Sequence, residues 1–398
     1  MTSTSKSPST NAADRTPRAT ILAGVPNINM TLYHRIRFRA GDPAAVITDA
    51  SGRSTLIIRD IEMHRARQLV KVDRVCCPAD FPPPGGLSGD RPTATAQATA
   101  EFLRREGIRE LWTDRTLPMI FAHHIREVGV QLHYDPELGV RERRSKDAQE
   151  VEWLRDAQRT TEQCIEMVCR LIARAPAAKS GILMHEGEPL TAERVRTILD
   201  IWLMQRGYIN VPAIIACGRE GGDCHNDGRG PLYTEQPIIV DVFPRNATTL
   251  YVGDCTRTMV HGKPGNIPEP VRAMHAAVKE AKVRAIAAMR AGTTGEAVHK
   301  VVIACMKEKG YPVGFPGHDV PPTYSGMPHG TGHGLGLDLK EPPLLDLGGP
   351  ELVVGDAVTV EPGLYSPVIG GVRIEDMVIV REGGVDNLNT LHEELSWD

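Results

Sequence analysis

Apolar and polar residues follow two different periods along this chain, and the period changes from segment to segment. Between residues 20 and 140, short apolar runs typical of strands alternate with stretches that have helical spacing. The runs 45–49 and 54–60 are separated by turn residues, so we expect a hairpin there. Residues 93–107 predict a helix, and residues 108–114 predict the next strand. This part of the chain is expected to be a small α/β domain.

A domain junction is expected near residue 144. Asp147 and Glu150 lie just after it and have the spacing of a helix capping box. The residues before the first strand are rich in Ser and Thr and contain no apolar run, which is typical of a disordered tail. The chain therefore divides into a tail, an α/β domain and a second domain, with the bounds 1–18, 19–143 and 144–398.

The second domain shows the same order of elements twice. Helical spacing continues to residue 172 and returns over 191–207, and strand-like runs follow. Two more helices are expected over 268–290 and 295–309, again followed by strand-like runs. Such a repeat predicts an α+β domain with an internal duplication, in which functional groups from the two halves meet.

Composition narrows the class of protein. The net charge of −4 among 398 residues gives no reason to expect nucleic-acid binding. No apolar run approaches the ~20 residues that a membrane span requires, and the N-terminus lacks the apolar core of a secretory signal. The eight cysteines form no C-x-x-C pair and are expected to be reduced thiols in a cytoplasmic protein.

Two aspartates suggest a metal site. Asp241 ends one apolar run, and Asp254 lies beside the next. If these runs pair as a hairpin about Asn246, the two carboxylates lie opposite or diagonal on one sheet face, within about 8 Å. Buried acids are costly unless they are paired or bind a metal ion, so the pattern predicts a shared cation.

Three further residues resemble ligands of the same ions. His333 lies in a Gly-rich stretch, Glu361 ends an apolar strand, and Glu375 is expected inside another strand. Any one acid alone would be read as a surface charge or a salt bridge. Four carboxylates and one imidazole together suit two divalent ions, with manganese as the first choice and cobalt, iron or zinc as alternatives. Bridged ions about 3.5–4 Å apart activate a shared water for hydrolysis.

The segments that carry these residues resemble the pita-bread metallopeptidases, which include aminopeptidase P, prolidase and methionine aminopeptidase. The specific stretches are VDVFPRNATTLYVGDCTRT, PHGTGHGLGLDLKEPP, VTVEPGLYSP and GGVRIEDMVIV. The resemblance covers residues 20–395. An N-terminal α/β domain places the chain nearer to the aminopeptidase P, prolidase and creatinase branch than to the shorter methionine aminopeptidases.

The resemblance implies a role for each ligand. Asp241 matches an aspartate held by one ion, and Asp254 matches an aspartate that bridges both. His333 matches the single histidine ligand. Glu361 and Glu375 match the two glutamates, of which Glu375 bridges. Creatinase-like relatives lack these ligands, whereas this chain has the full set.

The resemblance also implies catalytic and substrate-binding residues. His225 matches a histidine that contacts the substrate, and His329 matches one that binds substrate or intermediate. Structural, hydrogen-bonded histidines are the alternative for both. Arg373 matches an arginine that binds a substrate carboxylate or supports a metal ligand; a salt bridge to Glu375 or Asp376 is its alternative.

The chain departs from the family pattern in two places. The interval between Asp241 and Asp254 is two residues longer than usual, which a longer hairpin turn absorbs, and one catalytic position has a different residue type. The family has a catalytic histidine seven residues after the metal-binding one, and here that position is Lys340. A histidine changes charge near neutral pH, whereas a lysine does not do so readily. Either Lys340 faces the chemistry and alters it, or it turns outward and pairs with Glu341 or Asp338.

The expected function is metal-dependent hydrolysis of short peptides with proline in the second position, by an Xaa-Pro aminopeptidase or dipeptidase. Two alternatives stay open: a lyase or hydrolase of a small molecule on the same fold, and a non-catalytic binding protein. We expect a homodimer or homotetramer that binds neither nucleic acid nor membrane.

Overall fold

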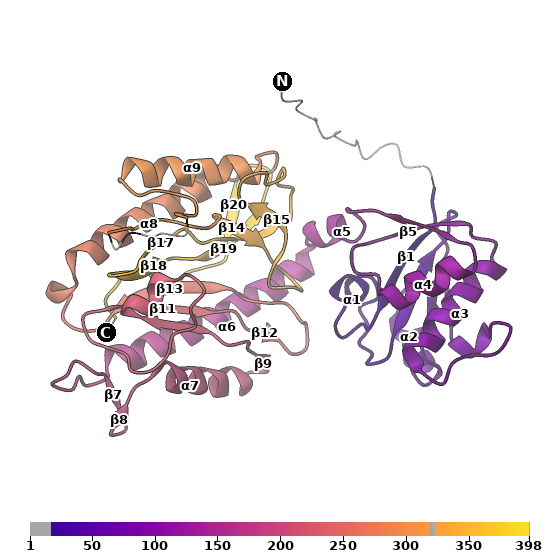
Figure 1. Ribbon diagram of the computed structural model, residues 1–398, viewed down its shortest axis with the longest axis horizontal. Helices are drawn as coiled ribbons and strands as arrows, with labels where there is room; N and C mark the ends of the chain where they lie inside the picture. Colours follow the sequence, from indigo (N-terminus) through magenta and orange to yellow (C-terminus); the bar gives the residue numbers. More distant parts are fainter. Residues whose placement is uncertain (1–16, 318–320, 322, 398) are drawn as a thin grey trace. The chain divides into compact units, whose positions relative to one another are not determined.

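The computed structural model describes residues 17–317, 321 and 323–397, and the chain divides into two compact units, Met1–Arg143 and Arg144–Asp398 (Figure 1). Of the expected disordered tail, residues 1–16 lie outside the described residues. Arg18, at its end, forms an ion pair with Asp135. Within the described ranges, no helix is long and apolar enough to cross a membrane.

The first unit is a six-stranded mixed sheet with helices on both faces. The strand order is β4-β3-β2-β1-β5-β6. Alternate residues of β1 point to opposite faces: Ile21 packs with α3 and α4, and Leu22 packs with α1 and α2. The expected hairpin is confirmed, since β2 and β3 pair antiparallel. The strands are β1 Thr20–Gly24, β2 Ala44–Thr48, β3 Ser54–Ile57, β4 Arg74–Cys76, β5 Glu110–Thr113 and β6 Gln131–Tyr134. The helices are α1 Met30–Ile36, α2 Met63–Leu69, α3 Arg91–Arg105 and α4 Met119–Glu127, with α5 Val140–Arg144 at the unit boundary.

The first half of the second unit packs a helix pair on a three-stranded antiparallel sheet. Helix α6 begins at the predicted capping box, in which the Asp147 side chain accepts from Glu150 N and the Glu150 side chain accepts from Asp147 N. Its buried face joins α7 and the sheet β10-β11-β13 in one apolar core. These elements are α6 Ala148–Ala173, α7 Ala192–Met204, β10 Ile214–Cys217, β11 Pro237–Val242 and β13 Cys255–Val260. Short strand pairs flank them: β7 Met184–His185 with β8 Glu188–Pro189, and β9 Tyr208–Ile209 with β12 Arg245–Asn246.

The second half repeats this arrangement. Helices α8 and α9 pack against each other and share an apolar core with the sheet β15-β14-β16-β19-β20 (Figure 1). The duplication expected from the sequence is therefore seen as two helix pairs, each on its own sheet. The helices are α8 Glu269–Ala288 and α9 Gly295–Glu308. The strands are β14 Gly332–Gly334, β15 Glu341–Leu345, β16 Ala357–Val360, β17 Gly363–Ser366, β18 Gly370–Arg373, β19 Asp376–Val380 and β20 Val385–Asn387.

The two halves meet along β13. Glu375 N donates to Thr256 O at 3.1 Å, and Arg373 N donates to Thr258 Oγ1 at 3.0 Å. These bonds hold the segment between β18 and β19 beside the strand that follows Asp254. Residues more than a hundred positions apart in the sequence are thereby brought to one place.

Candidate metal centre

The two aspartates lie on one face of the first-half sheet. Asp241, in β11, pairs with Thr256 of β13. Asp254 precedes Thr256 by two residues, so its side chain points to the same face as Asp241, in the diagonal position. The two runs pair antiparallel as expected, and the pairing continues beyond them, since Arg245 bridges Val252 and Asn246 N donates to Tyr251 O at 3.0 Å. Arg245–Asn246 also pairs with β9.

The other three candidate ligands come from the second half. His333 is the central residue of β14, and Glu361 follows the last residue of β16. The expectation that Glu375 lies inside a strand is wrong, because it lies in the break between β18 and β19. Its main-chain N–H bonds to β13 rather than to a ladder partner within its own sheet. The break turns its carboxylate toward the aspartates.

The side chains of the five candidates gather around one point. The donor atoms of Asp254, His333 and Glu375 all lie within 4.8 Å of one another. His333 Nε2 lies 3.8 Å from Asp254 Oδ2 and 3.3 Å from Glu361 Oε1. Asp241 Oδ1 is buried and has no hydrogen-bond partner within the described part of the chain. A buried carboxylate oxygen without a donor fits a ligand atom for a cation.

Neighbouring residues orient these donors. Thr256 Oγ1 donates to Glu375 Oε2 at 2.6 Å, and Thr359 Oγ1 donates to Glu361 Oε1 at 3.0 Å. His333 Nδ1 lies 3.1 Å from Gly334 O. Because a carbonyl only accepts, Nδ1 carries the proton and the lone pair of Nε2 faces the acids. This is the tautomer that a metal ligand requires.

Burial and mutual repulsion act on the acids. Burial, and then the charge of Glu375, raise the pKa of Asp254 well above its usual range. Burial, followed by Glu361 and Asp241, does the same to the pKa of Glu375. Burial also raises the pKa of Asp241, against the opposing effect of Arg373. Ionised acids at this site need positive charge to compensate them, and the donor set fits divalent ions.

The ligands open into a cavity of about 310 Å³. It brings together His225, His329, Arg373 and Lys340, the four residues for which the resemblance raised a catalytic or substrate-binding question. All lining residues belong to the second unit. They are Ile214, Cys224, His225, Asp241, Phe243, Asp254, His329, Gly330, Gly332, His333, Leu339, Lys340, Leu344, Asp346, Glu361, Arg373 and Glu375.

His329 is joined to Arg373 through Tyr365. Arg373 Nη1 donates to the Tyr365 hydroxyl at 2.7 Å, and that hydroxyl lies 2.9 Å from His329 Nε2. His329 Nδ1 lies 2.8 Å from Gly330 O and must donate to it, so a neutral His329 accepts the Tyr365 proton at Nε2. Burial lowers the pKa of His329 and favours that neutral form. The role of Tyr365 was not predicted; its position four residues after Glu361 was the available signal.

Arg373 supports a candidate ligand. Its Nη2 donates to Asp241 Oδ2 at 2.7 Å. The alternative salt bridge to Glu375 or Asp376 is wrong, because Asp376 pairs with Arg257 and Lys282. Burial alone would raise the pKa of Asp376, but these two cations outweigh burial and lower it.

His225 and Lys340 differ from the buried groups because both are exposed at the cavity wall. The alternative in which Lys340 pairs with Glu341 or Asp338 is wrong. Glu341 accepts from Lys146 at 2.7 Å, and Asp338 lies 4.0 Å from Arg245. Among the residues that the structure describes, none forms a hydrogen bond or an ion pair with Lys340.

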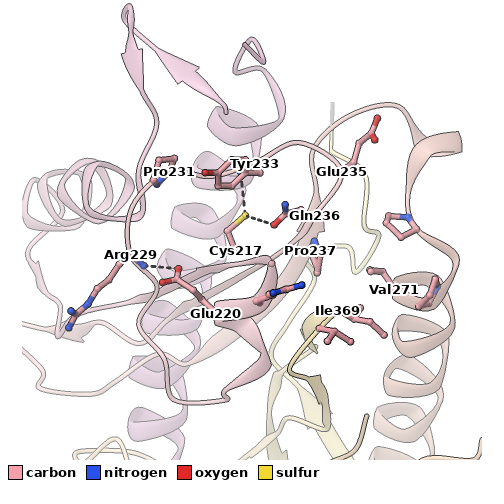
Figure 2. Close-up of a pocket in the computed structure, with 15 residues that line it drawn as sticks. Cys217, Glu220, Arg229, Pro231, Tyr233, Glu235, Gln236, Pro237, Val271 and Ile369 are labelled. Atoms are coloured by element: carbon pink, nitrogen blue, oxygen red, sulfur yellow. Dashed lines mark hydrogen bonds between the residues drawn. The ribbon is translucent and has the colours of Figure 1, made fainter. Parts of the chain in front are cut away.

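A larger cavity of about 610 Å³ lies elsewhere on the second unit, and Cys217 is among the residues that line it (Figure 2). The Cys217 thiol accepts from Tyr233 N at 3.3 Å and lies 3.9 Å from Gln236 Oε1 (Figure 2). Burial raises its pKa to about 11, so the thiol is protonated and is a poor nucleophile. Since none of the five candidate ligands lines this cavity, the smaller one is the candidate active site.

A second group of possible metal donors lies on α4 of the first unit. His124 Nδ1 and His123 Nε2 lie 3.2 Å and 3.5 Å from the two carboxylate oxygens of Glu127. His123 and Glu127 are exposed, so water competes for every position around this group. The buried centre in the second unit is the stronger candidate.

Known proteins share both the sequence pattern and the fold. An Xaa-Pro dipeptidase of Pyrococcus furiosus is 36% identical over 244 residues, which are 58% of this chain and 62% of that protein. This match spans less than two thirds of the relative's length. A prolidase structure from Pyrococcus furiosus has a TM-score of 0.74 and 22% identity, over 94% of this chain and 96% of that chain. An X-Pro aminopeptidase structure from Thermotoga maritima has a TM-score of 0.76 and 20% identity, over 96% and 97%.

The structural likeness extends over both units, and it shows that the chain has the pita-bread fold with an added N-terminal domain. Residues 152–382 match the sequence model of metallopeptidase family M24, and this range contains all five candidate ligands. The chain belongs to metallopeptidase family M24.

Proposed function

We propose that this protein is a metal-dependent exopeptidase that cleaves peptides with proline in the second position, as an Xaa-Pro aminopeptidase or dipeptidase. The convergence of the Asp254, His333 and Glu375 donors at the floor of a small cavity carries the proposal. Membership of a metallopeptidase family supports it. The dipeptidase and aminopeptidase relatives supply the substrate class.

We propose two divalent ions at this site, held by Asp241, Asp254, His333, Glu361 and Glu375. Manganese is the first choice because four of these five donors are carboxylates; cobalt, iron and zinc are the alternatives. Such ions would polarise the scissile carbonyl and activate the attacking water.

Side chains around the site orient the candidate metal ligands and are proposed to position the substrate. Arg373, Thr256 and Thr359 each hold one ligand carboxylate by a hydrogen bond. We assign to His225, which is exposed at the cavity wall, a hydrogen bond to the substrate. His329 already uses both ring nitrogens, so we assign it a positioning role through Tyr365.

Reconstitution separates this function from its alternatives. Metal-free protein should gain activity with Mn²⁺ or Co²⁺ on an Xaa-Pro dipeptide or an Xaa-Pro-Yaa tripeptide, and it should not cleave the matched Xaa-Ala peptides. Full metal content without Xaa-Pro cleavage would favour a lyase or hydrolase of a small molecule. Failure to bind metal would favour a binding protein. The cytoplasmic location and the homodimer or homotetramer stay predictions; light scattering tests the latter.

A further inference from the structure

The candidate cavity has a wall that the metal donors do not use. Lys340 lies in the bend between β14 and β15 and is exposed there. Phe243, Leu339 and Leu344 line the same cavity and give it an apolar side. A substrate seated on the metal donors therefore meets both apolar groups and one ammonium group.

The other strong cation of the cavity, Arg373, already uses four of its five N–H groups in hydrogen bonds within the protein. Arg373 donates from Nη2 to Asp241, from Nη1 to Tyr365 and Cys224 O, and from Nε to Thr256. His329 donates to Gly330 O and accepts at its other nitrogen. His329 therefore cannot bind a substrate anion without losing a contact. Arg373 is buried and has only one N–H outside these contacts.

Lys340 is in the opposite situation. The two acids nearest to it in sequence already face other cations: Glu341 is bound by Lys146, and Asp338 lies near Arg245. Within the described part of the chain, the Lys340 ammonium has no hydrogen-bond or ion-pair partner. It can therefore meet an incoming carboxylate without first breaking a native contact.

We infer that Lys340 binds the C-terminal carboxylate of the substrate and selects dipeptides over longer peptides; this rests on the proposed Xaa-Pro peptidase function. A volume of about 310 Å³ is at the lower end for ligand sites, which suits a short substrate. Each added residue moves the carboxylate by roughly 3.3–3.6 Å. An ammonium on the wall of so small a cavity is therefore expected to favour the peptide length that places its carboxylate within reach.

Kinetics on a matched pair of substrates tests this role. Alanyl-proline has the carboxylate, and alanyl-proline amide has the same shape without the charge. Lys340→Met should raise KM for alanyl-proline about tenfold, because one modest contact between the ammonium and the carboxylate is lost. It should change kcat by less than about twofold. It should leave KM for the amide unchanged. Lys340→Arg should retain most of the preference for alanyl-proline over the amide. Lys307 is an exposed lysine on α9, and Lys307→Met should leave that preference intact.

Calorimetry adds a measurement that does not depend on turnover. L-proline should bind the metal-loaded protein more tightly than L-prolinamide, and Lys340→Met should remove that difference. If Lys340→Met leaves the carboxylate-to-amide ratio of KM unchanged, the role of Lys340 is overturned while Xaa-Pro hydrolysis by the unaltered protein still stands. If the metal-loaded protein cleaves neither substrate, the proposed function fails, and the role of Lys340 fails with it.

Discussion

Arg373 Nη2 lies 2.7 Å from Asp241 Oδ2, and both residues are buried. This contact occupies one oxygen of the carboxylate and leaves Oδ1 without a protein partner among the described residues. Arg373 is itself held by Tyr365 through Nη1. The arginine therefore fixes the direction of a proposed metal ligand, which determines what its replacement should do.

Arg373→Met should weaken metal binding about 10- to 100-fold, as loss of a group that orients a ligand typically does. It should also reduce the free energy of unfolding by about 3–5 kcal/mol, because the Asp241 carboxylate then stays buried without its partner. Competition with a chelating dye measures the affinity, and urea unfolding measures the stability. Arg381→Met, which removes an exposed pair with Asp386, is the matched control and should change neither. Unaltered metal affinity in Arg373→Met would separate Arg373 from the centre.

Asp254→Asn should have opposite effects on metal binding and on the stability of the metal-free protein. Asp254 is buried next to Glu375, and the neutral amide keeps its shape while it removes one negative charge. The variant should lose most of the bound metal, because Asp254 is proposed to bridge both ions. The metal-free variant should be more stable than the metal-free parent by about 1–3 kcal/mol.

Metal analysis and thermal unfolding with and without a chelator measure the two effects. Glu308→Gln, on the exposed end of α9, controls for the loss of one acidic charge. An Asp254→Asn protein that keeps its metal would contradict the assignment of the ligand. One that is less stable without metal would show that repulsion among the acids is not the dominant cost.

The periodic elements could be predicted from the sequence because their signals are local. The capping box at Asp147 and Glu150 begins α6 as expected, and the helices from Ala148 to Glu308 appear within a few residues of their predicted bounds. Asp241 and Asp254 share a face because strand alternation fixes side-chain direction wherever two strands pair. Once the two strands pair, the positions of Asp241 and Asp254 in the sequence make them opposite or diagonal neighbours, so their carboxylates must lie close together.

Contacts between the halves could not be predicted in this way. The break at Glu375 depends on a hydrogen bond to Thr256 O, a residue 119 positions earlier, and no local pattern records it. Whether Lys340 pairs with Glu341 could not be decided from the sequence, because Lys146, which forms an ion pair with Glu341, lies in a different segment. Tyr365 likewise acquires its role only through Arg373 and His329. Side-chain partners of this kind follow from tertiary packing.

His225→Ala should reduce kcat on an Xaa-Pro peptide by about 10²–10³-fold, the usual range for loss of a hydrogen-bond donor that stabilises the transition state. Tyr365→Phe should have a smaller effect, about tenfold, because it removes only the hydroxyl that accepts from Arg373 and donates to His329. Steady-state kinetics at saturating metal distinguishes them. Equal losses in the two variants would contradict the division into a residue that contacts substrate and a residue that positions others.

Glu101 should make the first unit more stable above pH 4.5 than at low pH. The hydrogen bond from Arg104 lowers the pKa of Glu101 from 4.5 to about 2, against the opposing effect of burial, and Arg105 adds to the lowering. A lowered folded-state pKa stabilises the fold above the unfolded value, and that stabilisation is lost as the pH falls from 4.5 to about 2. The effect should be about 1 kcal/mol, because the Arg104 and Arg105 side chains are 50% and 41% exposed and are therefore screened. Glu101→Gln should lose this dependence, as urea unfolding at pH 6 and pH 3 would show; an unchanged difference between the two pH values would contradict it.

Removing one partner of the ion pair between Lys146 and Glu341 should lower the free energy of unfolding more than replacing both partners with neutral residues. Lys146 Nζ lies 2.7 Å from Glu341 Oε1, and the two side chains are 1% and 5% exposed. Lys146→Met should therefore destabilise the second unit by about 3–5 kcal/mol, because it removes the positive charge that lies next to a buried carboxylate. Lys146→Met combined with Glu341→Gln should recover much of that loss, since the carboxylate charge that Lys146 neutralised is then also removed. Urea unfolding of the two single variants and the double variant gives the coupling energy directly. Additive losses in the double variant would mean that the charges do not compensate each other.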